Sequence, residues 1–241
     1  EFRVLANVGY GFRAPNVFDL GTLGERPGNR FNIPNPDLQS ERITQFDLGL
    51  RYRNQRLRAD LVFWQFDYTD RITSVLTGEV TPGGRDIVQT RNQASAELWG
   101  FEASASLQLS EYLKADLVLN FTRGEQADVI GSTEPADRVP PLNGRLGLDY
   151  LWGDRWVIEP YLLFAASQNR LSDRDRRDSR IDPTGTDGWV SANLGATWLA
   201  DDRWSVRLAA MNLFDERYRV HGSGIDAVGR NFLLDLRYLW Q

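Results

Sequence analysis

The stretch RLSDRDRRDSRIDPTGTDGW, residues 170–189, holds a dense group of ionisable side chains. It contains five aspartates and five arginines. Carboxylates at this density could hold Ca²⁺, which prefers oxygen ligands. The interleaved arginines bring the net charge of the stretch close to zero, which favours a self-neutralising surface loop over a cation site. We therefore predict no metal site here.

His221 is the only histidine of the chain, and it lies in the polar stretch YRVHGSG. Hydrolysis by a serine nucleophile needs a serine, a histidine and a carboxylate held together. A single histidine with no candidate partner at a strand end does not supply that set, and no glycine-rich phosphate loop precedes a helix. The sequence therefore predicts no catalytic residues, no enzyme activity and no cofactor.

Charge and composition exclude further classes of protein. The chain has 28 basic and 33 acidic residues and a formal net charge of −5, so no basic field indicates a nucleic-acid partner. It has no cysteine, which excludes disulfides and thiolate metal sites. No run of about 18 apolar residues is present, which excludes a membrane-spanning helix. Eight Trp, eight Tyr and twelve Phe suit alternating strands better than a dry core.

Apolar residues recur at every second position along most of the chain. In QFDLGLRYR, residues 45–53, Phe46, Leu48 and Leu50 alternate with polar residues or glycine. This period of two is typical of strands, whereas a helix has a period of 3.6. The sequence predicts an all-β chain without helices. Its ten antiparallel strands are expected at about 1–12, 41–53, 56–74, 86–109, 112–124, 139–151, 155–168, 188–199, 203–214 and 229–240.

The connections between these strands are alternately short and long. The short ones lie at 53–56, 109–112, 152–155 and 200–203, and the long polar ones at 13–40, 75–85, 125–138, 169–187 and 215–229. Short turns at one end and long loops at the other are typical of bacterial outer-membrane barrels. We therefore predict an antiparallel up-and-down transmembrane β-barrel wall whose long loops contact a ligand at the cell surface.

Aromatic residues gather near the short turns and the C-terminus. Rings at this level fit the girdle of a membrane barrel, at the depth of the lipid headgroups. The alternative is that they cap the core of a soluble sandwich, which would not need long loops at one end only. The residues are Tyr52, Tyr112, Trp152, Trp156, Trp198, Trp204 and Trp240.

The alternation also assigns the two faces of each strand. Leucines on one face should meet lipid, and the intervening charged residues should face a polar lumen, where they line a path or pair with one another and with water. The predicted outward residues are Leu48, Leu117, Leu148, Leu208 and Leu236. The predicted inward residues are Asp47, Asp116, Asp149, Arg207 and Asp235, together with Arg51, Asp60, Glu102, Lys114, Arg145 and Arg237.

Five segments resemble, in order, the C-terminal half of TonB-dependent outer-membrane receptors. They are YGFRAPNVFDLG (10–21), NPDLQSERITQFDLGLRY (35–52), RNQASAELWGFEASAS (91–106), RVPPLNGRLGLDY (138–150) and MNLFDERYRVHGSG (211–224). Each motif alone is weakly specific, but five in the same order are strongly so. The residues that match the family motifs are Arg13, Pro15, Asn16, Asn35, Pro36, Glu41, Asn92, Gly100, Glu102, Pro140, Pro141, Asn212, Asp215 and Tyr218.

The resemblance implies an active-transport receptor in the bacterial outer membrane for a scarce nutrient such as a ferric siderophore, haem or cobalamin. The implied partners are outer-membrane lipid, a small nutrient ligand such as an iron chelate, and the TonB complex, which would act through an N-terminal segment. Haem receptors of this family often use a loop histidine. YRVHGSG also occurs in relatives without implied haem chemistry, so we do not expect His221 to bind haem.

Receptors of this family begin with a plug domain and a TonB box, and their barrels have about 22 strands. Residues 1–241 contain neither the plug nor the box, so we expect them to form the C-terminal part of a larger barrel. We then expect an open sheet in which 1–12 and 229–240 do not pair. The alternatives are a complete small outer-membrane barrel with an enzymatic or adhesive role, and a soluble β-rich binding protein.

Overall fold

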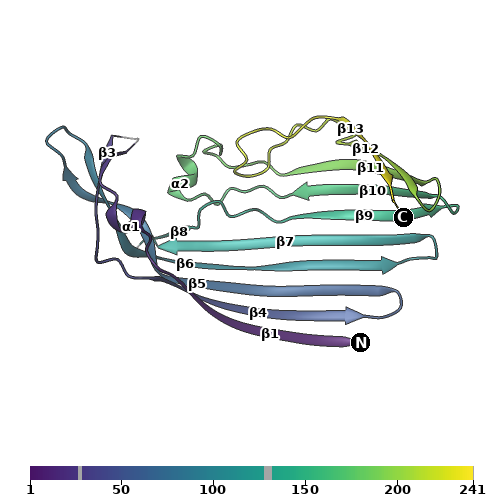
Figure 1. Ribbon diagram of the computed structural model, residues 1–241, viewed down its shortest axis with the longest axis horizontal. Helices are drawn as coiled ribbons and strands as arrows, with labels where there is room; N and C mark the ends of the chain where they lie inside the picture. The colour runs from purple at the N-terminus through teal and green to yellow at the C-terminus, as the bar shows by residue number, and fades with distance from the viewer. Residues whose placement is uncertain (27–28, 128–131, 241) are drawn as a thin grey trace.

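The computed structural model describes residues 1–26, 29–127 and 132–240. Ten long strands form one antiparallel sheet in which each strand pairs with the next along the chain (Figure 1). They are β1 (Phe2–Arg13), β4 (Glu41–Arg53), β5 (Leu57–Val80), β6 (Asp86–Gln108), β7 (Leu113–Ala127), β9 (Asn143–Trp152), β10 (Trp156–Ala165), β11 (Trp189–Leu199), β12 (Trp204–Met211) and β13 (Asn231–Tyr238). The predicted ten-strand, up-and-down topology is confirmed.

The two ends of the sheet differ as expected. The four short turns lie at one end, together with both chain termini, and the longer connections lie at the other (Figure 1). Within the described residues, β1 pairs only with β4, and β13 pairs only with β12. The sheet is therefore curved but open, which confirms the expectation for the first and last strands.

The expectation of a chain without helices was wrong at two places in the long loops. The short helix α1 (Val17–Gly21) begins at Asn16, whose side chain accepts hydrogen bonds from the first turn. The single turn α2 (Asp173–Arg176) begins at Ser172, which accepts from the Asp175 N–H. Local side-chain caps stabilise such turns. The two helical turns are too short to show a helical period in the sequence. No helix in the described ranges is long and apolar enough to cross a membrane.

Strands also extend into the expected loops. The predicted loop 75–85 is mostly strand, because β5 continues to Val80 and β6 begins at Asp86. The loop 13–40 contains the hairpin β2 (Gly24–Arg26) and β3 (Arg30–Ile33), and β8 (Thr133–Pro135) pairs with β7. The pairing of β3 with β6 is parallel, which corrects the all-antiparallel expectation. Residues 27–28 and 128–131 of the predicted loops lie outside the described residues.

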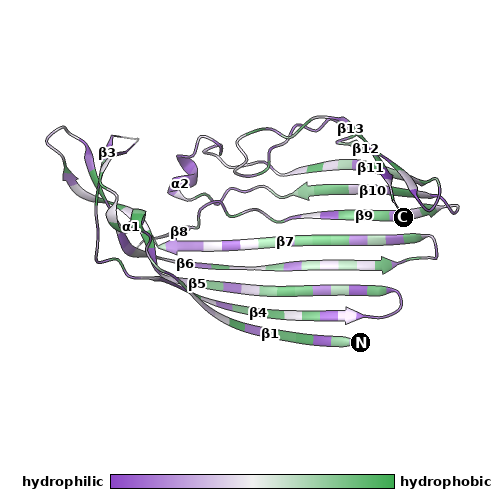
Figure 2. Ribbon diagram, viewed as in Figure 1, coloured by the Kyte–Doolittle hydropathy of each residue, from purple (hydrophilic) through white to green (hydrophobic). Residues whose placement is uncertain are grey.

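The strand register places apolar and polar side chains on opposite faces of the sheet. Leu208 lies opposite Ala196 and Leu234, whereas Arg207 lies opposite Thr197 and Asp235. The same alternation between the two faces runs through all ten long strands. The five predicted outward leucines therefore share one face, and the five predicted inward charged residues share the other. Leu208 is 54% exposed, and a band of such residues is unfavourable in water but suits lipid. Figure 2 shows hydrophobic colour along the strands.

Aromatic rings form two rows on the apolar face. At the short-turn end, Trp156 lies opposite Trp152 and Trp198, with its ring 6.1 Å from that of Trp198. Nearer the loops, the Trp99 ring lies 5.5 Å from Phe121 and 6.3 Å from Phe63. From Trp156 to Phe164 is eight residues of strand, roughly 27 Å, or roughly 20 Å across the membrane at the usual tilt. This fits the height of the apolar band of a membrane barrel. Trp240 lies beyond the end of β13.

Candidate functional site

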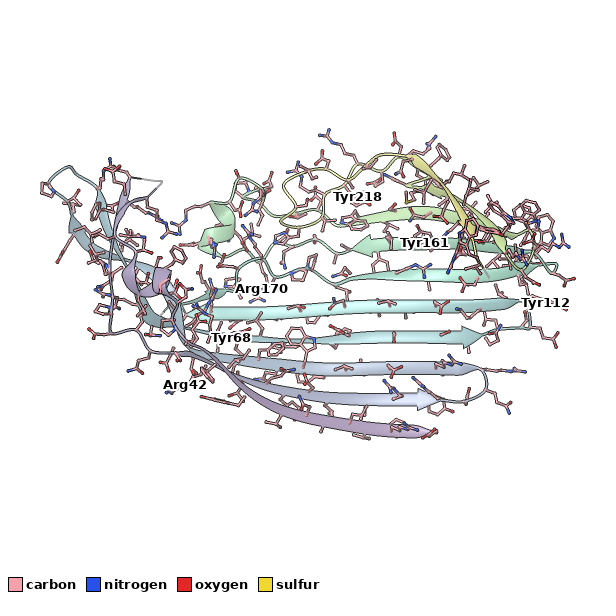
Figure 3. All side chains as sticks on the ribbon, in the orientation of Figure 1. Arg42, Tyr68, Tyr112, Tyr161, Arg170 and Tyr218 are labelled. Carbon is pink, nitrogen blue, oxygen red and sulfur yellow. The ribbon has the colours of Figure 1, made fainter. Side chains whose placement is uncertain are left out.

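The polar face of the sheet is a wall of paired charges. The Lys114 ammonium lies 2.8 Å from Asp149 and 3.1 Å from Asp116. Arg51 pairs with Asp60, and Arg207 lies 3.5 Å from Glu159. The Arg145 guanidinium lies 4.7 Å from the centre of the Tyr161 ring (Tyr161 is labelled in Figure 3). These contacts support the prediction that inward charges pair with one another. Because paired charges are less available to a ligand, the candidate ligand site lies at the loop end of the sheet.

The first family-motif residues fasten the loop 14–40 to the end of the sheet. Arg13 contacts Glu41 at 2.6 Å and Asp19 at 2.7 Å. Glu41 also accepts a hydrogen bond from the Ile72 N–H at 2.7 Å. Burial alone would raise the pKa of Asp19, but hydrogen bonds from the Asn16 backbone and from Arg13 outweigh it and lower that pKa. Pro15 precedes this cap directly.

Two asparagines hold the second half of the same loop against the strands. Asn35, just before Pro36, donates to the Thr90 carbonyl at 2.8 Å. Asn92 donates to the carbonyls of Gln39 and Asp70, both at 2.8 Å, and accepts from the Gln39 N–H at 2.8 Å. Each of these bonds joins segments distant in the sequence, so these motif residues position a loop.

The central motif residues lie along the wall. Gly100 of β6 is opposite Trp64 of β5. Glu102 is exposed on the polar face opposite Asn120. Pro140 and Pro141 link the segment after β8 to β9, and the Pro141 carbonyl accepts from Asn143 at 2.9 Å. The central motif residues are therefore spread along the sheet and do not form one cluster.

The last motif residues anchor the loop 215–229. Asn212 and Asp215 have φ values of 52° and 58°, a conformation that asparagine and aspartate tolerate better than most residues. The Asn212 side chain accepts from the Glu216 N–H at 2.8 Å and donates to the Glu216 carbonyl at 2.9 Å. Asp215 accepts from the Arg230 N–H at 2.7 Å, and the Tyr218 ring stacks 4.0 Å from Trp189. The family-motif residues near the first and last loops therefore hold those loops, and the motif residues as a whole are not gathered in one site.

A folded unit that the sequence did not reveal lies among the loops. We call residues 133–139 and 169–187 the loop module. Leu171 and Ile181 are buried in it, and Ser172 and Asp175 are 0% and 1% exposed, so this loop has a small core of its own. Asp175 accepts from the Arg138 N–H at 3.0 Å, and the Ser172 hydroxyl donates to Asp137 at 2.8 Å. The one available signal was the Ser-x-x-Asp helix start at Ser172.

The acidic and basic side chains of the loop module neutralise each other. Arg180 and Arg138 both contact Asp178, and Arg174 lies 3.1 Å from Asp137. Burial would raise the pKa of Asp137, but hydrogen bonds from Ser172, Gln126 and Arg174 lower it below the usual value. These pairs support the predicted self-neutralising loop. In the parts of the chain that the structure describes, no group of His, Asp and Glu is arranged to hold a metal.

Two polar hollows open among the loops. The larger, of about 610 Å³, lies between the loops 182–188 and 216–226 and is lined by Thr186, Tyr218 and Arg219 (Tyr218 is labelled in Figure 3). The smaller, of about 300 Å³, lies between the loop module and the sheet, where Arg71 and Gln126 meet Arg174 and Arg177. Both hollows combine hydrogen-bond donors and acceptors, as a small polar ligand requires.

His221 lies beside the larger hollow. Its Nδ1 is 2.9 Å from the Thr186 hydroxyl. Burial lowers the pKa of this histidine, and the nearby Asp175 opposes that effect only in part. The imidazole therefore stays neutral near pH 7, and its contact with Thr186 joins two loops.

We expect Asp175→Ala to open the loop module without unfolding the sheet. The change leaves the part-buried Arg138 N–H without its acceptor, which costs up to about 1–3 kcal/mol. Hydrogen exchange should accelerate at 133–139 and 169–187 and stay unchanged in β9 and β10. Asp173→Ala is the matched control, because the Asp173 side chain is 75% exposed. Equal exchange in the two variants would show that the module does not depend on Asp175.

The amphipathic sheet, its two aromatic rows and its anchored loops together define an outer-membrane β-barrel of the receptor type. The family model "TonB dependent receptor-like, beta-barrel" matches residues 1–213. The chain therefore belongs to the TonB-dependent receptor family, and it is a bacterial outer-membrane protein.

Curated relatives match almost the whole chain. An iron-regulated outer membrane virulence protein of Vibrio cholerae is 26% identical over 97% of this chain and 36% of its own length. The ferric enterobactin receptor PirA of Pseudomonas aeruginosa is 25% identical over 94% of this chain and 32% of its own length. The chain thus spans about a third of the length of these relatives.

Solved structures share the fold. The copper transporter OprC superposes with a TM-score of 0.76 at 22% identity, over 98% of this chain and 37% of that chain. The ferric enterobactin receptor PfeA of Pseudomonas aeruginosa gives a TM-score of 0.74 at 20% identity, over 98% and 38%. The relatives and these structures are named as virulence protein, receptor and transporter, and the family is one of transport receptors, which confirms the prediction that the protein is not an enzyme.

Proposed function

We propose that the protein is an outer-membrane receptor that binds a ferric siderophore at the cell surface and imports it with energy supplied through TonB. The observation that carries the proposal is the set of polar hollows in ordered loops, all at one end of a lipid-suited sheet. The names of the Vibrio and Pseudomonas relatives, which refer to iron and to ferric enterobactin, favour an iron chelate over cobalamin or haem.

We further propose that residues 1–241 act as the C-terminal part of a barrel of about 22 strands. The plug domain, the TonB-binding segment and the remaining strands would come from the rest of the receptor, and lipid would surround the apolar face. The chain spans only about a third of the length of its relatives, which supports this arrangement. The small closed barrel with an enzymatic or adhesive role is disfavoured, because within the described residues β1 and β13 do not pair with each other. Their open edges would cost several kcal/mol in hydrocarbon unless further strands cover them.

Loop exchange tests the ligand site. Replacing 169–187 and 215–229 with the corresponding loops of a related receptor should shift growth on single ferric chelates toward the donor's preference, because loops held by a rigid wall carry recognition. Exchange of the short turn 109–112 is the control. Unchanged preference after loop exchange would place specificity elsewhere, and uptake that persists without TonB would contradict the proposed energy source.

A further inference from the structure

The larger hollow, between the loops 182–188 and 216–226, adjoins the polar face of the sheet. By the strand register Trp189 lies on the same face as Asn193, and Asn193 lies opposite Tyr161, whose ring contacts Arg145 of the polar wall. The Tyr218 ring stacks 4.0 Å from Trp189 and lines the hollow. A ligand held on the polar side of the loops therefore meets this hollow, and its charge has to suit the lining.

Both guanidinium groups of this hollow are already paired. Arg219 donates to one oxygen of Asp226 at 2.6 and 2.9 Å, and Arg217 donates to the other at 3.0 Å. Hydrogen bonds from Arg219 and Arg217 lower the pKa of Asp226, so this carboxylate is ionised near pH 7. The two arginines of the lining therefore offer an incoming anion no unpaired guanidinium group.

The same hollow has an excess of carboxylates. Asp182 accepts from the Thr184 N–H at 2.8 Å and from its hydroxyl at 2.6 Å, and these bonds, with the charge of Arg219, lower its pKa. Asp187 and Glu216 are exposed, and within the described residues neither side chain has an ion pair or a hydrogen bond. The four carboxylates exceed the two guanidinium groups by two negative charges.

The smaller hollow has no excess of positive charge either. Arg174 lies 3.1 Å from Asp137, and Arg177 lies 3.9 Å from Asp173. Three guanidinium groups there are matched by three carboxylates. These residues are Arg71, Arg174, Arg177, Glu134, Asp137 and Asp173.

Ferric chelates differ in charge according to the groups that bind the iron. Three hydroxamate groups each carry one negative charge and balance Fe³⁺, so their complex is neutral. Three catecholate groups each carry two negative charges, so their complex keeps three. Like charges brought together in a binding site oppose association and exclude unsuitable partners. A lining with two excess negative charges therefore disfavours the catecholate complex.

We propose that the larger hollow selects a neutral or cationic ferric chelate, of the tris-hydroxamate kind, over a polyanionic tris-catecholate. Asp187 and Glu216 determine this specificity, because their charges are not neutralised by the lining. Thr186 and Tyr218 supply a hydroxyl and an aromatic ring without adding charge. This inference rests on the proposed function, the binding of an iron chelate, and adds the charge class of that chelate.

Binding of two chelates to the full receptor, purified from outer membranes in neutral detergent, tests the inference. The probes are ferrichrome, a neutral tris-hydroxamate, and ferric enterobactin, a tris-catecholate, each loaded with radioactive iron. The native receptor should bind ferrichrome at least about tenfold more tightly. Asp187→Asn combined with Glu216→Gln should strengthen enterobactin binding severalfold and leave ferrichrome binding unchanged. Both side chains are exposed, so the fold should be retained.

Asp37→Asn combined with Glu79→Gln is the matched control, because it removes the same charge from exposed positions in the loops outside both hollows. It should change either affinity by less than about twofold. Raising the salt concentration from about 0.1 M to about 1 M shortens the Debye length from about 10 Å to about 3 Å. The gap between the two chelates in the native receptor should then narrow.

The outcomes separate this inference from the proposed function. Equal or tighter binding of ferric enterobactin by the native receptor would overturn the charge selection and leave an iron-chelate receptor in place. An equal gain in the control pair would overturn the role of the hollow in favour of general surface charge. Binding of neither chelate would contradict the proposed function and this inference with it.

Discussion

Replacing Leu208 with arginine is expected to prevent most of the protein from assembling in the outer membrane. Leu208 is 54% exposed on the apolar face of β12, between Ala196 and Leu234. It lies four residues from Trp204 of the turn-side aromatic row, roughly 13 Å along the strand and thus near the middle of the apolar band. A charge at the midplane of a barrel costs about 2–4 kcal/mol.

The neighbouring Arg207→Leu is the matched control, because it changes charge and size at the adjacent position on the other face. It removes one contact of 3.5 Å to Glu159, and such exposed ion pairs contribute at most about 1 kcal/mol. Assembly is measured as the heat-modifiable fraction in outer-membrane preparations. We expect a much larger loss for Leu208→Arg, and the reverse order would mean that the two faces are wrongly assigned.

Adding a single methyl group at Gly100 is expected to disturb the central sheet. A Cβ atom there would lie 2.2 Å from the Phe121 carbonyl oxygen and 2.7 Å from the Trp64 ring. The carbonyl belongs to the backbone of β7 and cannot move without breaking the pairing of β6 and β7. Overpacking of this kind costs about 1–3 kcal/mol, so Gly100→Ala should lower the unfolding midpoint in urea of the protein in detergent.

Gly9→Ala supplies the control for this prediction. Gly9 also lies in a long strand, but its added Cβ would meet only Gln45, at 3.6 Å, which is ordinary contact. We expect its urea midpoint to match the native protein. A midpoint for Gly100→Ala equal to that of Gly9→Ala would show that Trp64 and β7 do not close over Gly100 as described.

The strands and their faces could be predicted because each strand carries its own signal. Residues 46–52 of β4 and 204–208 of β12 alternate between apolar residues and polar residues or glycine, and a one-residue error in register would place charges in lipid. The turn-side aromatics were also visible, since they lie next to short turns. The loop-side row was missed because Trp99 and Phe121 lie inside long strands, where no turn marks their level.

The loop structure could not be predicted, since it depends on contacts between distant residues. The parallel pairing of β3 with β6 joins Arg30 to Asp86, and nothing local to either segment requires it. The burial of Asp175 likewise depends on an N–H donated from Arg138. Resemblance identified Asn35, Asn92 and Asn212 as family residues, but only their bonds to distant carbonyls show that they fasten loops.

One face of this sheet meets lipid and the other meets water. Residues 1–241 contain no cysteine, so single cysteines introduced at 204–210 can carry nitroxide labels, and their accessibility to oxygen and to a water-soluble nickel chelate can be measured in lipid. We expect a period of two, with 206, 208 and 210 favouring oxygen and 205 and 207 favouring the chelate. Equal accessibility along β12, or the opposite phase, would contradict it.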